Sequence, residues 1–347
     1  MDVHLIGGLN NMHSFDIAQP RIGFCCKIQS SHDKADKKLN TTTTTLTWLN
    51  NQSRDKAVEK LWTIIHNNCE VLKRQVEWVG NLSRNQRQFR LSSDLFPAYT
   101  HEDWMWFYFE PDVVNYLEKH LAKVGDIARG KDVRLSFHPG QFCVLASEND
   151  GIVDNSIVEF EYHTDIARYM GYGVRFQDFK CNVHIGGKRG PQGIIDALRK
   201  LSPEARNILT IENAEYTWGL EHSLQLVEHC ALVVDIHHHW INSKGEYIEP
   251  TDRRFELVKD SWRGIRPVIH YSVSREDVLV EHDPDELPDF KLLGSMGFTS
   301  AKLRAHSDYY WNNRVNEWAA SFNSWADIQC ESKQKNLASE PFVKNWL

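Results

Sequence analysis

Short runs of apolar and β-branched residues alternate along this chain with segments whose apolar residues recur every three or four positions. The runs predict strands, and the periodic segments predict amphipathic helices. Eight alternations follow one another with no linker between them, which predicts a single (β/α)8 barrel and not two doubly wound halves. The predicted strands are 21–26, 88–91, 133–137, 181–185, 208–211, 231–236, 267–271 and 326–330, and the main predicted helices are 57–79, 113–127, 158–170, 192–201, 220–229, 254–262 and 312–322.

The pattern also suggests how the chain is divided. Residues 1–20 are expected to form an irregular extension, 21–337 the barrel, and 338–347 a tail. Residues 29–53 are expected to be an insertion loop, because they hold a Lys/Asp-rich patch and a run of threonines at 41–45. We interpret this loop as mobile, although lysines and hydroxyls beside a barrel mouth can also contact phosphates.

Composition excludes several classes of protein. With 347 residues and 41% hydrophobic content, the chain can bury a large core. No apolar run approaches the ~20 residues that span a bilayer, and the first 19 residues lack the layout of a secretory signal. The seven cysteines are scattered without a C-x-x-C pair, so most are expected to be buried thiols. We expect an intracellular monomer, in the cytoplasm or nucleoid, that is not secreted and has no membrane contact.

The sixth predicted strand runs directly into Asp235 and three histidines. Asp235 and His238 are three positions apart, so they can converge if the chain turns just after the strand. His237 and His239 are then expected to support the site or face solvent.

Other predicted strands end in similar side chains. In a barrel the carboxyl ends of all strands meet at one mouth. Each residue alone is more often structural, but buried imidazoles and carboxylates crowded together are costly unless a cation neutralises them. Such a set without thiolates suits zinc, manganese or iron. The residues that join Asp235 and His238 are His101, His138, His184, Glu212, His270, His306 and Glu331.

A cluster of this kind supports more than one chemistry. Glu212, Asp235 and Glu331 can bridge ions through their two oxygens, while neutral imidazoles fill the remaining positions. Two or three ions ~3.5–4 Å apart can activate water and stabilise an in-line phosphoryl displacement. The same scaffold could instead polarise a sugar carbonyl for isomerisation, so the ligand types leave the reaction open. The net charge of -7 is weak evidence against nucleic acid, because bound cations reverse the local sign.

In their order along the chain, these motifs resemble the UV damage endonuclease (UvdE) family, a TIM-barrel relative of endonuclease IV. The resemblance covers about residues 21–337, and the ordered set is far more specific than any single motif. The motifs are RIGF (21–24), FRLSSDLFP (89–97), SFHPGQF (136–142), HIGG (184–187), IEN (211–213), DIHH (235–238), HYS (270–272), HSDY (306–309) and ESKQK (331–335).

The resemblance implies an enzyme that nicks damaged double-stranded DNA immediately 5′ to a lesion. Cyclobutane pyrimidine dimers, 6-4 photoproducts and abasic sites are the implied lesions, and Mn2+ is the implied ion, with Zn2+ or Mg2+ as other candidates. Glu212, Asp235 and Glu331 would be the catalytic carboxylates. The implied metal ligands are His101, His138, His184, Glu212, Asp235, His238, His270, His306 and Glu331.

The resemblance also assigns residues that probe the lesion, and the chain departs from the family pattern nearby. Gln141 and Phe142 match a Gln-Tyr pair that enters the duplex opposite the flipped lesion, and Phe24 stands at a family Tyr position near the damage pocket. Val268 stands where the family has a metal-binding lysine, so water or another side chain must complete that position. The alternatives are a nuclease restricted to abasic sites, as in endonuclease IV, and a lesion-binding protein with reduced cleavage.

Overall fold

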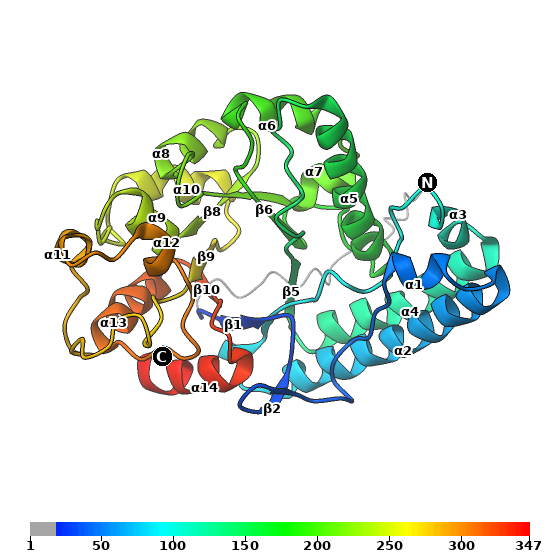
Figure 1. The fold of residues 1–347 in the computed structure, drawn as a ribbon, viewed down its shortest axis with the longest axis horizontal. Helices are drawn as coiled ribbons and strands as arrows, with labels where there is room; N and C mark the ends of the chain where they lie inside the picture. The colour runs from blue at the N-terminus through cyan, green and yellow to red at the C-terminus, as the bar shows by residue number, and fades with distance from the viewer. Residues whose placement is uncertain (1–18) are drawn as a thin grey trace, which may run out of the picture.

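The computed structural model describes residues 19–347, so almost all of the expected extension 1–20 lies outside the described residues. Within them, eight parallel strands close into a barrel in the order β1-β10-β9-β8-β7-β6-β5-β4. The predicted (β/α)8 fold is therefore confirmed (Figure 1). The strands are β1 (Ile22–Cys25), β4 (Gln88–Arg90), β5 (Arg134–Phe137), β6 (Lys180–His184), β7 (Leu209–Glu212), β8 (Ala231–Asp235), β9 (Val268–Tyr271) and β10 (Asp327–Cys330).

Helices surround this barrel, as Figure 1 shows. The helix predicted over 220–229 is wrong in length, because α8 (Leu220–Ser223) is short. A 3-10 turn, Leu224–Leu226, follows it and packs against α6 (Gly190–Leu198), α10 (Arg254–Ser261) and β8. No helix in residues 19–347 is long and apolar enough to cross a membrane. The main helices are α2 (Arg54–Gly80), α4 (Pro111–Gly130), α5 (Asp150–Tyr169), α6 (Gly190–Leu198), α7 (Pro203–Ile208), α8 (Leu220–Ser223), α9 (Ile236–Asn242), α10 (Arg254–Ser261), α13 (Asn313–Ser321) and α14 (Lys335–Trp346), with short helices α1 (Leu46–Asn50), α3 (Met105–Tyr108), α11 (Phe290–Ser295) and α12 (Ser300–Leu303) and 3-10 turns at Arg84–Gln86 and Phe322–Ser324.

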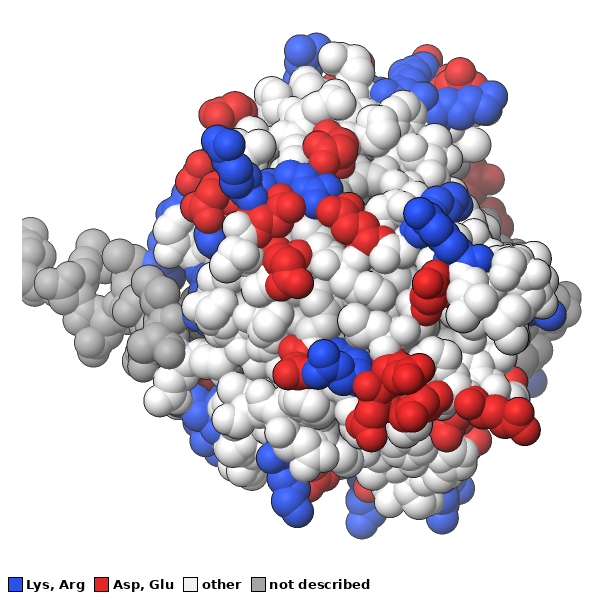
Figure 2. Space-filling model, turned by 90° about the vertical axis from the view of Figure 1, so that its left-hand side faces the viewer, with Lys and Arg blue, Asp and Glu red and all other residues white. Residues whose placement is uncertain are grey.

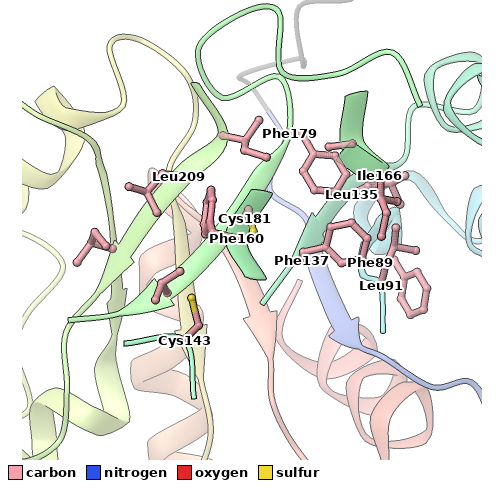
Figure 3. Packing of buried hydrophobic residues seen from close by; sticks show 14 of the residues in the cluster. Phe89, Leu91, Leu135, Phe137, Cys143, Phe160, Ile166, Phe179, Cys181 and Leu209 are labelled. Carbon is pink, nitrogen blue, oxygen red and sulfur yellow. The ribbon is translucent and has the colours of Figure 1, made fainter. Parts of the chain in front are cut away.

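The two faces of the barrel strands bury different kinds of side chain, apolar on the outer face and often polar on the inner face. Side chains that point outward, such as Phe137 and Cys181, pack in an apolar layer with Phe160 of α5 (Figure 3). Many inward positions are polar: across the barrel, Arg134 donates to Asp327 at 2.7 Å. Successive residues of a strand point to opposite faces, so each strand supplies the helix layer and the barrel interior together.

Two segments outside the barrel strands are ordered. Within the expected insertion 29–53, β2 (Gln29–Ser31) and β3 (Lys34–Ala35) form an antiparallel pair, and α1 follows. Helix α14 crosses the expected boundary between barrel and tail at 337/338 and packs against β1 and β2. These contacts place the insertion and the end of the chain beside each other.

Candidate metal centre

Glu212, at the end of β7, lies at the centre of the cluster that the strand ends form. Its side chain is fully buried, and four imidazoles surround it. His270 Nδ1 is 3.0 Å from Oε2, His138 Nε2 is 3.4 Å and His184 Nε2 is 3.6 Å from the same oxygen, while His238 Nδ1 is 3.3 Å from Oε1. These side chains come from five different strands or strand ends, as the barrel topology predicts.

The cluster contains three sets of potential ligand atoms, and within each set the atoms lie within 4.8 Å of one another. Glu212 is shared by the first and second sets, and Asp235 by the second and third. Shared carboxylates are what neighbouring ions require as bridging ligands. The sets are His138–His184–Glu212, Glu212–Asp235–His238 and Asp235–His270–Glu331.

Unsatisfied polar atoms show that these residues fit divalent ions. Glu212 Oε1 and Asp235 Oδ2 are buried, and neither makes a hydrogen bond; His270 Nδ1 is also buried and makes none, although it lies 3.0 Å from Glu212 Oε2. Burying a polar atom without a partner costs free energy, and such atoms are rare in protein interiors. All three belong to residues in the ligand sets, so a cation coordinated there would satisfy them.

Backbone carbonyls orient three of the imidazoles in the same way. In each case Nδ1 lies within 3.0 Å of a carbonyl oxygen. A carbonyl can only accept, so Nδ1 must carry the proton and Nε2 keeps its lone pair for a metal. The pairs are His138 with Pro139 at 2.9 Å, His238 with Asn213 at 3.0 Å, and His306 with Glu331 at 2.8 Å.

Burial and mutual charge shift the pKa values of the cluster. Burial lowers the pKa of His138 to about 4, which keeps this imidazole neutral. Burial, together with the charges of Glu212 and Glu331, raises the pKa of Asp235 to about 7. For His238 burial acts to lower the pKa, but Asp235 and Glu212 outweigh it and raise the value to about 9. The site therefore concentrates negative charge that a divalent cation would stabilise.

The turn after β8 brings Asp235 and His238 together as the sequence predicts. Asp235 caps α9, because its Oδ1 accepts from the backbone N–H of His238 at 2.8 Å. His237 has both ring nitrogens beside hydroxyls, at 2.8 Å from Ser272 and 3.2 Å from Ser274. His237 and His239 were expected to support the site or face solvent; both are only 4% exposed, so neither faces solvent.

Two predicted ligands lie outside the three sets. His101 accepts from the backbone N–H of Asp103 at 3.2 Å and lines, with His138, a cavity of about 1020 Å3 at the mouth. His306 lies beside Glu331 through the carbonyl contact described above. Their assignment as metal ligands stays a prediction.

Comparison with known proteins identifies the family. The sequence model of "UV-endonuclease UvdE" matches residues 20–343. The chain belongs to the UV-endonuclease UvdE family. A UV DNA damage endonuclease from Bacillus cereus is 26% identical over 308 residues, covering 85% of this chain and 86% of the relative. One from Bacillus velezensis is 26% identical over 262 residues, covering 72% of each.

Solved structures agree with the fold. A crystal structure described as SacUVDE aligns with a TM-score of 0.70 at 25% identity, covering 94% of this chain and 100% of the other. A structure described as AsfvAP:AG aligns with a TM-score of 0.50 at 12% identity, covering 94% of this chain and 96% of the other, and supports the fold alone.

The residues that the resemblance to UvdE assigns to lesion probing differ in exposure. Phe142 is 86% exposed and lines the cavity that His101 and His138 share. Phe24 is 2% exposed, and its ring packs 5.0 Å from Phe89 and 6.1 Å from Trp78. Successive residues of a strand point to opposite faces. On β1 the next residue, Cys25, points into the barrel, so Phe24 points outward to the helix layer. Phe24 is therefore buried in the structure, and its assignment to lesion probing stays a prediction.

Polar and charged side chains in the barrel interior complete the UvdE centre, and none of them was predicted from the sequence. Arg90 forms an ion pair with Glu331, and Asn182 donates to Glu212. Lys180 Nζ is 2.9 Å from His270 Nε2, and burial lowers its pKa to about 7. The available signal was the alternation on β6, where residues 180, 182 and 184 are all polar.

Val268 contributes no ligand. It is 1% exposed and packs with Ala231, Val233 and Trp262. Lys180, from β6, contacts the imidazole of His270 instead. The lysine beside His270 therefore comes from β6 and not from β9, the strand that carries Val268.

Proposed function

We propose that this chain is a metal-dependent DNA repair endonuclease that hydrolyses the phosphodiester bond immediately 5′ to a lesion. The observation that carries the proposal is the trio of ligand sets joined by Glu212 and Asp235 at the mouth of a UvdE-family barrel. The relatives named as UV DNA damage endonucleases support cyclobutane dimers and 6-4 photoproducts as substrates. We include abasic sites, and we propose two or three Mn2+ ions, with Zn2+ or Mg2+ as alternatives.

Each part of the centre has a role in this reaction. Divalent ions held by the three sets would supply an activated water and stabilise the attacking and leaving oxygens. Glu212 and Asp235 would bridge ions, and Glu331 would bind beside Asp235 and His270. Arg90 holds Glu331 through their ion pair, which restrains that carboxylate. The carbonyl contacts to Nδ1 keep the imidazoles in the tautomer that coordinates through Nε2.

The cavity beside the centre suits the damaged nucleotide. Phe142 lines it, and Gln141, the preceding residue, is also exposed. A lesion already weakens pairing and stacking, so extruding it costs less than extruding a normal base. In this proposal the Phe142 ring fills the gap in the stack, and the Gln141 amide hydrogen-bonds to the bases left behind.

The test is a nicking assay on duplexes that each carry one defined lesion. We expect Mn2+-dependent cleavage 5′ to a cyclobutane dimer, a 6-4 photoproduct and an abasic site, and no cleavage of an undamaged duplex. Cleavage at abasic sites alone would favour the endonuclease IV-like alternative. Tight lesion binding without any cleavage would favour the lesion-binding alternative that Val268 suggests.

A further inference from the structure

The segment 27–38, which we call the lysine hairpin, has no role in the metal centre, yet it is fixed beside it. It begins at the end of β1 and contains β2 and β3. Asn336 accepts from the backbone N–H of Gln29 at 2.7 Å and donates to its carbonyl at 3.0 Å. Gln334 accepts from the N–H of Asp33 at 3.0 Å and donates to its carboxylate at 2.6 Å. The first strand of the hairpin and its turn are thus bound to the segment that follows Glu331.

The lysine hairpin carries four exposed lysines that have no acidic partner. Lys27, Lys34, Lys37 and Lys38 are exposed, and none forms an ion pair with any residue from 19 to 347. Some other lysines of the surface are paired, as in the contacts Lys188–Glu148 at 2.9 Å and Lys200–Asp154 at 2.8 Å. The face that carries α11 also shows basic and acidic side chains next to each other (Figure 2).

The hairpin's own carboxylates do not neutralise these lysines. Asp33 is held by Gln334, and its Oδ2 lies 3.2 Å from His32 Nε2. Asp36 accepts from the backbone N–H of Lys38 at 2.8 Å, and the side chain of Lys38 is exposed. The four ammonium groups are therefore available to an external anion.

The hairpin lies next to the cavity beside the metal centre. Cys26 and Lys27 line the same cavity as His138, so the base of the hairpin lies at the mouth. At its turn, His32 stacks on Tyr309 with ring centroids 5.9 Å apart. A duplex whose scissile phosphate reaches the centre must pass over this rim. B-DNA carries one negative charge per ~1.7 Å of its axis, so several phosphates would lie within reach of such a rim.

We propose that the lysine hairpin binds backbone phosphates of the DNA that flanks the lesion. The inference rests on the proposed function, because it needs duplex DNA at the mouth. Lysines bind phosphates as point charges and carry no sequence information, so this surface holds the duplex in place and does not select the lesion. Its rigid attachment to Gln334 and Asn336 keeps the lysines at a fixed distance from the ligand Glu331.

The test is the salt dependence of DNA binding by the triple variant K34Q/K37Q/K38Q in the full chain. Each lost phosphate contact lowers the slope of log affinity against log salt by about 0.9, so we expect a decrease of up to about 2.7. The same decrease is expected for damaged and undamaged duplexes of equal length. The variant should keep the metal content of the parent.

A matched control separates this effect from a change in net charge. The variant K119Q/K123Q/K344Q removes three exposed lysines of α4 and α14 that also lack ion pairs within residues 19–347. We expect its salt slope to equal that of the parent. An unchanged slope in the hairpin variant, or an equal decrease in the control, would overturn the inference. If the parent itself fails to bind a lesion-containing duplex, the proposed function fails instead.

Discussion

At the scale of single residues, Glu212 is the side chain on which the centre depends. It is fully buried, contacts four imidazoles and belongs to two ligand sets. Glu212→Gln keeps the shape of the side chain and removes its charge. We expect metal affinity to fall by at least ~100-fold, more than the usual loss for a supporting residue, and nicking to become undetectable. Metal titration and nicking assays would be compared with Glu256→Gln on the surface of α10. A fully active Glu212→Gln enzyme would refute the assignment.

For Phe142 we expect an effect on DNA binding and not on metal binding, because its side chain is exposed whereas the predicted metal ligands are buried or half-buried. The double variant Gln141→Ala/Phe142→Ala should bind damaged duplexes more weakly while binding undamaged duplexes as before. Loss of one stacked ring costs about 1–3 kcal/mol, which is about 5- to 150-fold in affinity. Fluorescence anisotropy measures both affinities, and metal analysis should show no change. Equal preference for damaged DNA in parent and variant would remove the wedge role.

His163 on α5 should make the stability of the fold depend on pH in a way that does not involve metal ions. It is fully buried, its Nδ1 donates to the carbonyl of Glu159 at 2.8 Å, and its Nε2 makes no hydrogen bond. Burial lowers its pKa from 6.5 to about 4. Between these values the unfolded chain binds a proton that the folded chain does not, so stability falls as pH decreases.

The variant His163→Phe removes this proton. We expect the free energy of unfolding to decline less steeply from pH 6.5 to 4, by about 1.4 kcal/mol per pH unit. Urea unfolding of metal-free protein at several pH values measures the slopes. His229→Gln, at an exposed position, should retain the slope of the parent. Parallel curves for His163→Phe and the parent would contradict the prediction.

At the scale of elements, buried charges join strands at the opposite end of the barrel from the metal centre. Asp327, the first residue of β10, accepts from Arg134 at 2.7 Å and from Arg266 at 2.9 Å. It also accepts from the backbone N–H of Arg21 at 2.9 Å. One carboxylate therefore links β10 to β5, to the segment before β9 and to the segment before β1.

Asp327→Asn removes the negative charge that two buried guanidiniums face. Breaking a buried ion pair by removing one partner costs ~3–5 kcal/mol, so we expect a decrease of that size in the free energy of unfolding. Chemical denaturation measures it. Metal stoichiometry in the folded variant should be unchanged, because Asp327 is not in a ligand set. A loss below ~1 kcal/mol would show that these strands are held by other contacts.

The alternation of strands and helices was enough to predict the barrel, and the strand ends were enough to predict the residues that form the three sets of potential ligands. Asp235 and His238 converge because their three-residue spacing fits a helix that begins at the end of β8. Lys180 and Arg90 were missed because inward orientation depends on the register of the closed barrel. A shift of one residue exchanges the two faces of a strand, so the sequence alone could not tell which of its residues point into the barrel.

At the scale of the whole molecule, the metal centre and the fold stabilise each other. The three ligand sets draw on β5, β6, β7, β8 and β9 and the residue after β10, so ions bound there would link most of the barrel. Without them, buried carboxylates face one another, and burial together with the charges of Glu212 and Glu331 raises the pKa of Asp235. Ions that bind only the folded chain must therefore raise its stability.

Removal of metal ions tests this coupling in one experiment. We expect chelated protein to melt at a lower temperature than the parent, and added Mn2+ to restore the melting temperature in a concentration-dependent way. At 100 times the dissociation constant a single site contributes about 2.7 kcal/mol. Glu212→Gln should lose most of the Mn2+-dependent shift, whereas Glu256→Gln should keep it. If Mn2+ has no effect on the melting temperature of the parent, its buried carboxylates do not form an ion-binding site.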